Sequence, residues 1–319
     1  MGMKNYRTII FVIAYLFTPF HSFSQKKMDV LEIKALYNKA IDFNRKKDYD
    51  NSSKCFKELL KYLPSEAGFY LGEQYFYGLG VTKNIDEALK YYQIAAEAGE
   101  PISQQRLALY YFNEETNIRD RSLAFYWNRT ASTNPDGVDC GDAGECAYQL
   151  AYCYKYGIGT NINKEYSELW MAMSAILDYS KALSYLEEKY NIKNDWETEA
   201  EELAFQRSLT NHYYSLIIPK IQNSNSLEAR VVKCLYFLQN QKYEEFLSIA
   251  KSLYSNEEVS SEGKKNVGEL LIAYYRDYKN DKYNVELLEE ELLNLIDIDE
   301  LDYKYWFLQQ FTICLSKIS

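Results

Sequence analysis

The sequence predicts an all-α fold, a right-handed α/α superhelix (solenoid) of stacked helical hairpins. The first observation behind this prediction is self-similarity at offsets of 36 and then 43 residues. The equivalent positions are Leu71, Tyr75 and Ala88 in one unit, Leu107, Tyr111 and Ala124 in the next, and Leu150, Tyr154 and Ser167 in the third. The second observation is that no segment alternates apolar and polar residues over a strand's length between turn signals. A period of roughly 35 to 40 residues is typical of hairpins that bury their faces only against neighbouring units.

Residues 1–24 have the pattern of a secretory signal. Lys4 and Arg7 precede an apolar run over 9–20, and small residues stand just before a cut at Gln25. This run is shorter than the roughly 20 residues that span a bilayer, and no later run approaches that length. We therefore expect an exported protein, periplasmic or secreted, without stable membrane insertion after signal removal. An uncleaved anchor is the alternative.

The charge of the chain limits its partners. The formal net charge is −10, and the expected signal contributes two basic residues and no acidic ones. Nucleic acids and anionic membrane surfaces require basic patches on the protein. We therefore expect neither as a partner; an acidic array suits a basic partner or simply remains in solution.

A helical hairpin is predicted over residues 28–65. Ala40 and Phe43 lie on its first helix, a polar turn follows at 44–48, and Phe56 lies on a second helix that Pro64 ends. The placement of these residues resembles a tetratricopeptide repeat. The resemblance implies that the array begins with this hairpin.

The three units that carry the offset lie within residues 66–180 and resemble Sel1-like repeats, relatives of the tetratricopeptide repeat with a lengthened turn. The motifs that carry the resemblance are Leu71-Gly72, Gly78-Leu79-Gly80 and Ala95-Ala96-Glu97-Ala98-Gly99 in the first unit, and Leu150-Ala151, Gly157-Ile158-Gly159 and Trp170 in the third. The paired glycines are expected in turns with positive φ, and Gly72 and Ala108 are expected to let two helices approach closely. In the middle unit, residues 113–117 replace the paired glycines, which predicts a differently shaped loop.

An insertion at 134–144, between the second and third units, combines acidic residues with cysteines. Its acidic residues recur at every third position: Asp136, Asp139, Asp142 and Glu145. Such oxygen ligands suit calcium, but the spacing is not that of an EF-hand, so we expect a solvated acidic loop and no metal site. Cys140 and Cys146 are a disulfide candidate because export would permit the bridge; packed thiols are the alternative.

Residues 181–319 keep the helical periodicity but lose the paired glycines. A second register, at an offset of 40, relates Asn240 and Tyr243 to Asn280 and Tyr283. We therefore expect degenerate tetratricopeptide-type hairpins in this half. The remaining expected features are breaks at 191–195 and 222–226 and an amphipathic capping helix over 299–317.

The sequence offers little catalytic chemistry. Once the signal is removed, His212 is the only histidine, so a His-rich zinc site and a two-histidine relay are absent. Ser261-Glu262-Gly263-Lys264 fits the Ser-x-x-Lys pattern of penicillin-recognising enzymes but lacks the companion motifs. We therefore predict that the protein is not an enzyme and holds no cofactor or metal. An exported hydrolase of the cysteine-rich Sel1-like type is a lesser alternative, which the family resemblance implies.

The resemblance implies a binding function. Helical-repeat arrays form a concave surface from the first helices of successive hairpins, where a protein or peptide partner can bind. The tetratricopeptide register assigns this groove to Tyr37, Phe69, Glu73, Gln105, Tyr148, Tyr152 and Lys155. Its tyrosines either contact the partner or pack between repeats. We expect a monomeric adaptor or scaffold; an immunity or inhibitor protein against a secreted toxin is the alternative.

Overall fold

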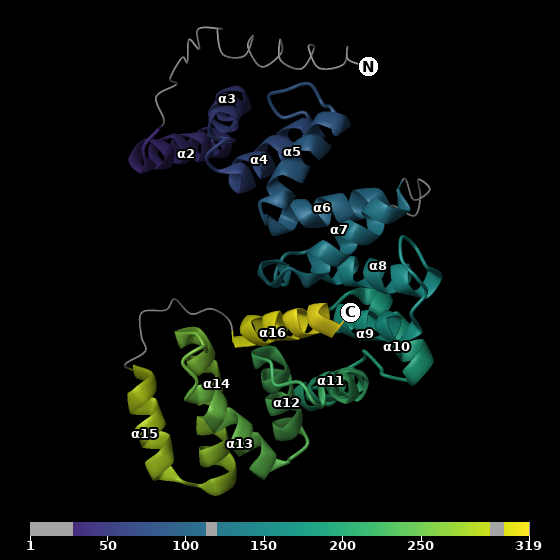
Figure 1. Cartoon of the computed structure of the whole chain (residues 1–319), viewed down its shortest axis with the longest axis vertical. Helices are drawn as coiled ribbons and strands as arrows, with labels where there is room; N and C mark the ends of the chain where they lie inside the picture. The colour runs from purple at the N-terminus through teal and green to yellow at the C-terminus, as the bar shows by residue number, and fades with distance from the viewer. Residues whose placement is uncertain (1–27, 113–119, 294–302, 319) are drawn as a thin grey trace, which may run out of the picture.

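The structure, a computed structural model, describes residues 28–112, 120–293 and 303–318 (Figure 1). All regular elements within these ranges are helical, which confirms the all-α prediction. The expected signal at 1–24 and the glycine-free turn at 113–117 lie outside the described residues. Within the same ranges, no helix has both the length and the apolar character needed to cross a bilayer.

Four hairpins follow one another from the N-terminal end of the described chain. Their helices are α2 (Val30–Arg45) and α3 (Tyr49–Leu59), α4 (Pro64–Tyr77) and α5 (Ile85–Glu97), α6 (Pro101–Phe112) and α7 (Arg121–Thr133), and α8 (Ala143–Tyr156) and α9 (Lys164–Ile176). The two helices of each hairpin pack together, and each hairpin packs on the next (Figure 1). The second helices begin at capping side chains that accept a hydrogen bond from a backbone amide of the first turn: Asp48, Asn84, Asp120 and Asn163.

Paired glycines shape the turns of the second and fourth hairpins. Gly78 and Gly80 have φ angles of 73° and 64°, and Gly157 and Gly159 both have φ of 67°. Residues with a side chain are strained at these angles. At Gly159 a Cβ atom would also lie 2.1 Å from the backbone oxygen of Arg121, so this turn packs directly on the preceding hairpin. The prediction that the paired glycines are turn residues with positive φ is confirmed.

Small residues also bring helices close together, as predicted for Gly72 and Ala108. A Cβ atom at Gly72 would lie 2.5 Å from the ring of Tyr92, because that ring covers the glycine. Ala108 on α6 and Ala88 on α5 are completely buried. The Sel1-like units therefore pack through positions where a larger side chain has no room.

The first helices of the second, third and fourth hairpins lie on the inner side of the array. α4 contacts α6, and α6 contacts α8, more extensively than the second helices contact one another. Closer spacing on one side curves a repeat array toward that side. The predicted groove positions on α4, α6 and α8 therefore belong to helices that line the concave side.

The C-terminal half continues the chain with less regular hairpins. Its elements are α10 (Ser180–Tyr190), α11 (Glu199–Ile221), α12 (Leu227–Gln239), α13 (Tyr243–Tyr254), α14 (Ser261–Tyr274), the π-helical turn η3 (Tyr275–Lys279), α15 (Lys282–Leu293) and α16 (Tyr303–Ile318). A 3₁₀ turn, η2 (Pro135–Gly137), precedes α8. The breaks predicted at 191–195 and 222–226 both fall between helices.

The C-terminal helix does not cap the end of the array, which differs from the prediction. α16 lies against α12, α7 and η2, in the middle of the molecule (Figure 1). Trp306 and Phe307 join the core of α12–α14, whereas Phe311 and Leu315 join the core of α8, α9 and α11. A helix that is apolar on two sides is stable only between two partners, so α16 packs between the Sel1-like hairpins and the C-terminal half.

Candidate functional site

Three of the predicted groove residues contribute to packing. Tyr37 is half-buried against the core of the first hairpin, and Phe69 against the core shared by the second and third hairpins. Gln105 is only 1% exposed, and its Nε2 donates a hydrogen bond to the backbone oxygen of Gly137 at 3.1 Å. The side chain of Gln105 is therefore not accessible to a partner, in contrast to the prediction.

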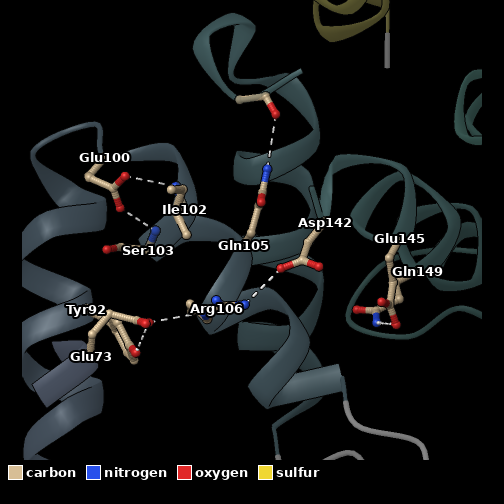
Figure 2. A network of polar contacts seen from close by, with 11 residues as sticks. Glu73, Tyr92, Glu100, Ile102, Ser103, Gln105, Arg106, Asp142, Glu145 and Gln149 are labelled. Carbon is tan, nitrogen blue, oxygen red and sulfur yellow. Dashed lines mark hydrogen bonds and ion pairs between the residues drawn. The ribbon is translucent and has the colours of Figure 1, made fainter. Parts of the chain in front are cut away.

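Glu73 belongs to a charged network that crosses three hairpins (Figure 2). Its Oε1 accepts hydrogen bonds from the hydroxyl of Tyr92 at 2.6 Å and from Nε of Arg106 at 3.3 Å. Nη1 of Arg106 on α6 donates to Oδ2 of Asp142, immediately before α8, at 2.9 Å. Burial and the hydrogen bond to Glu73 raise the pKa of Tyr92, so its hydroxyl stays protonated and keeps donating. The network fixes α4, α6 and the start of α8 relative to one another.

A second cluster joins α8 to α10, and we call it the Tyr–Lys surface. Its members are Tyr148, Tyr152, Lys155 and Tyr156 on α8, and Tyr179, Lys181, Tyr185, Lys189 and Tyr190 on or next to α10. The rings of Tyr148, Tyr152 and Tyr156 form a ladder along α8, with successive centroids 4.8 and 5.2 Å apart. The structure thus brings together three predicted groove residues, Tyr148, Tyr152 and Lys155.

Lysine ammonium groups lie over the rings of this surface. Nζ of Lys155 lies 5.5, 5.3 and 5.4 Å from the ring centroids of Tyr152, Tyr156 and Tyr185, respectively. Nζ of Lys181 lies 5.9 Å from the centroid of the first ring of the ladder. Cation–π attraction holds these ammonium groups over the rings.

Exposure differs between the two ends of the tyrosine ladder. Tyr148 is 8% exposed and contributes to the core, whereas Tyr156 is 53% exposed. Tyr152, between them, is half-buried, and Tyr190 on α10 is 39% exposed. Tyr148 therefore anchors the ladder in the core, and Tyr156 offers most of the accessible ring area on α8.

Glu168 on α9 connects the Tyr–Lys surface to a pocket. Its carboxylate accepts hydrogen bonds from Nζ of Lys189 and the hydroxyl of Tyr185, both at 2.6 Å, and from the hydroxyl of Tyr190 at 2.7 Å. Although burial opposes ionisation, these hydrogen bonds lower the pKa of Glu168 and keep it charged. Glu168 also lines a pocket of 360 Å³ between α9 and α11, whose apolar wall contains Leu169, Leu216 and Pro219.

The residues of α10 were not predicted as part of the site, because α10 follows the last recognisable repeat. A signal was nevertheless present: Lys181, Tyr185 and Lys189 are spaced four residues apart, which places them on one face of a helix. Such a face of lysines and a tyrosine, next to a tyrosine ladder, indicates a continuous surface. Arg106 was also missed, because its role depends on acidic partners from two other hairpins.

The acidic insertion contributes a structural carboxylate and no metal site. Asp142 pairs with Arg106, and no group of three or more His, Cys, Asp or Glu side chains in the described part of the chain could hold a metal ion. Cys140 and Cys146 are free thiols in the structure, so the candidate disulfide is not formed there. Burial raises the pKa of Cys140 to about 11 and also raises that of the buried Cys146, which keeps both thiols protonated.

Comparisons with known proteins identify the repeats. A family model described as Sel1 repeat matches residues 65–100, 101–134 and 144–179. No curated protein sequence matches the chain.

Two solved structures are similar to this chain over most of its length. A protective antigen of uropathogenic Escherichia coli strains, which displays an SLR fold, is 14% identical, and the match covers 88% of this chain and 60% of the antigen with a TM-score of 0.42. A Sel1 repeat protein from Oxalobacter formigenes is 15% identical, and that match covers 88% of this chain and 93% of the other with a TM-score of 0.41. The family match itself establishes that this chain contains three Sel1 repeats, which correspond to the hairpins α4–α5, α6–α7 and α8–α9.

Proposed function

We propose that this Sel1-repeat protein is exported and binds a protein or peptide partner through the Tyr–Lys surface. The observation that carries the proposal is the partly exposed tyrosine ladder on α8, with lysines held over its rings. Tyrosine offers flat, amphipathic contact area and has few rotatable bonds, so its own side chain loses little conformational entropy when a partner packs on it. Cation–π contacts restrict the surface further before a partner arrives.

The scaffold holds this surface in place. Asp142 at the start of α8 is fixed by Arg106, and the turn after α8 is fixed by Gly159, which packs on α7. Both ends of the ladder-bearing helix are therefore anchored to the preceding hairpin. A surface on a rigid helix binds more precisely than one on a loop.

The pocket beside Glu168 extends the surface with a site for an anchoring side chain. Interfaces gain most of their binding energy from a few side chains that fill pockets, and an apolar wall suits an apolar anchor. Ser215→Phe fills this pocket from an exposed position on α11, so we expect it to weaken partner binding. Gln206→Phe is the control, because it places the same ring on the opposite, exposed face of α11.

A comparative pull-down from the native envelope or medium, quantified by mass spectrometry, tests the proposal. We expect Tyr152→Ala combined with Tyr156→Ala to lose the partner. Tyr126→Ala on α7 is the matched control, because Tyr126 and Tyr156 are both 53% exposed. Tyr156→Ala alone keeps the test valid if the double variant unfolds, as circular dichroism would show. A partner captured equally by all variants would contradict the assignment of the surface.

The same experiment separates the remaining alternatives. A captured partner whose toxic activity is blocked would identify an inhibitor rather than an adaptor. Turnover of an acyl or glycosyl substrate that survives the tyrosine substitutions, with no partner captured, would contradict a binding function. Export is tested by the N-terminal mass of protein recovered from the envelope or medium, which we expect to begin at Gln25; protein that retains Met1 in the cytoplasm would contradict it.

A further inference from the structure

We infer that the partner segment bound by the Tyr–Lys surface is acidic. This inference rests on the proposed function. Lys155 and Lys181 form no ion pair with the described residues, whereas the neighbouring Lys189 is paired with Glu168 at 2.6 Å. The two charges that lie over the ladder are therefore positive and available to a partner's carboxylates.

The positions of the two lysines define the spacing of those carboxylates. Lys181 lies over Tyr148, and Lys155 follows Tyr148 on α8 by seven positions. At about 1.5 Å of rise per residue, the two ammonium groups are roughly 10 Å apart along the ladder. An extended peptide advances about 3.3 Å per residue and turns every second side chain to the same face. Carboxylates two or four residues apart, about 7 or 13 Å, therefore bracket this distance, and with the longer spacing the middle side chain would face the tyrosine rings.

The negative charge of the whole chain does not oppose this binding strongly. The formal net charge is −10, but charges beyond about 8 Å are largely screened at physiological ionic strength. A partner on the ladder therefore interacts mainly with the charges next to it. The expected partner differs from the basic one that the net charge alone suggests.

The contacts of the lysines also favour carboxylates over a neutral ligand. A lysine whose ammonium group is already held over aromatic rings loses little further side-chain entropy when that group forms an ion pair. A carboxylate that reaches Lys155 replaces no existing ion pair, because that ammonium group has none among the described residues. We therefore expect binding that weakens as salt is added.

Selection from a random-sequence displayed peptide library tests the inference. The full-length mature protein is the bait, and we expect it to enrich peptides rich in Asp and Glu. Lys155→Glu combined with Lys181→Glu should bind a selected acidic peptide about tenfold more weakly or worse and should itself select basic peptides. The control is Lys242→Glu combined with Lys251→Glu, which changes the net charge equally at two lysines that also lie over rings, and it should keep the acidic preference.

The outcomes distinguish this inference from the function on which it rests. Basic or uncharged peptides that bind wild type and are lost on Tyr152→Ala with Tyr156→Ala would overturn the acidic partner but keep the binding surface. Peptides that do not depend on these tyrosines, or a library with no enriched peptide, would overturn both. An acidic preference that survives the Lys155→Glu, Lys181→Glu pair would overturn the role of the two lysines.

Discussion

The Sel1 hairpins, residues 64–176, and the C-terminal half, residues 180–318, are both helical but are held together differently. In the hairpins, each helix packs mainly on elements next to it in the sequence, and small residues such as Gly72 make the closest contacts. In the C-terminal half, large aromatic side chains fill the core. There Phe311 on α16 stacks on Tyr213 with ring centroids 5.1 Å apart, although nearly a hundred positions separate them in the chain.

The comparison teaches which contacts a sequence pattern can reveal. A repeat whose contacts are local must place the same small residue at the same position in each unit, so the pattern is visible. In the C-terminal half, a helix that is distant in the sequence completes the core. Such a helix needs apolar residues on its buried faces, but these residues need not recur at a fixed offset. The Tyr–Lys surface lies at the boundary between the Sel1 hairpins and the C-terminal half, because α8 belongs to the last Sel1 hairpin and α10 follows it.

The largest effect is expected from removing the long-range contact. Phe311→Ala leaves a cavity next to Tyr213, and we expect it to lower the free energy of unfolding by about 3–5 kcal/mol, as measured by chemical denaturation. Tyr283→Ala is the control, because Tyr283 is 73% exposed and its loss should change stability by less than about 0.5 kcal/mol. Equal effects at the two positions would contradict the role of Phe311 in holding α16 to the core of the C-terminal half.

The next largest effect is expected from a turn glycine of the Sel1 hairpins. Gly159→Ala adds a Cβ atom 2.1 Å from the backbone oxygen of Arg121 and strains a residue with φ of 67°. We expect a loss of about 3 kcal/mol in the free energy of unfolding. Gly141→Ala should be nearly neutral, since a Cβ atom there meets nothing within 4 Å. A neutral Gly159→Ala would show that the turn can move away from α7.

A smaller effect is expected from the charged network. A double-mutant cycle with Arg106→Ala and Asp142→Ala should give a coupling free energy of about 1 kcal/mol, because both side chains are about one-third exposed. The exposed pair Lys46 and Asp42 is the control and should give a coupling of a few tenths of a kcal/mol at most. Similar couplings for both pairs would mean that the network does not hold the hairpins in place.

The smallest effect is a pH dependence at His212, where α11 packs on the last residue of α10. Burial lowers the pKa of His212 below 6.5, and Lys189 acts in the same direction while Glu168 opposes it. The unfolded state therefore binds a proton more readily, so this contribution to stability is complete above pH 6.5 and is lost as the pH falls through the lowered value. The quantity to measure is the free energy of unfolding of wild type minus that of His212→Phe, from pH 8 to about 5. This signed difference should fall as the pH falls, because only the wild type loses the contribution of the neutral histidine. Wild type that gains stability relative to His212→Phe toward acid pH would contradict this prediction.

The Sel1 hairpins could be predicted from the sequence because their chemistry is local. A tight turn requires residues with positive φ, which glycine adopts without strain, and φ is positive at Gly78, Gly80, Gly157 and Gly159. The repeat register shows the positions of these turns directly. The position of α16 could not be predicted. Its amphipathic pattern predicts a helix but does not say which distant core that helix joins.

The candidate site was predicted in part for the same reason. The register placed Tyr152 and Lys155 on the inner helix of a hairpin, and there they form one surface. The register could not show that Gln105 is buried, because the backbone oxygen that it binds comes from the insertion before α8. The contribution of α10 depends on packing after the last repeat, where the register ends.

Hydrogen–deuterium exchange of the protein with and without its captured partner tests the central claim most directly. We predict that bound partner slows amide exchange in peptides covering 148–156 and 181–190 and leaves α12–α15 unchanged. The comparison with α12–α15 is informative because η3 and α15 also expose tyrosines, with Tyr278 at 59% and Tyr283 at 73% exposure. Slowed exchange at η3 and α15, with no change along α8 and α10, would contradict the assignment of partner binding to the Tyr–Lys surface.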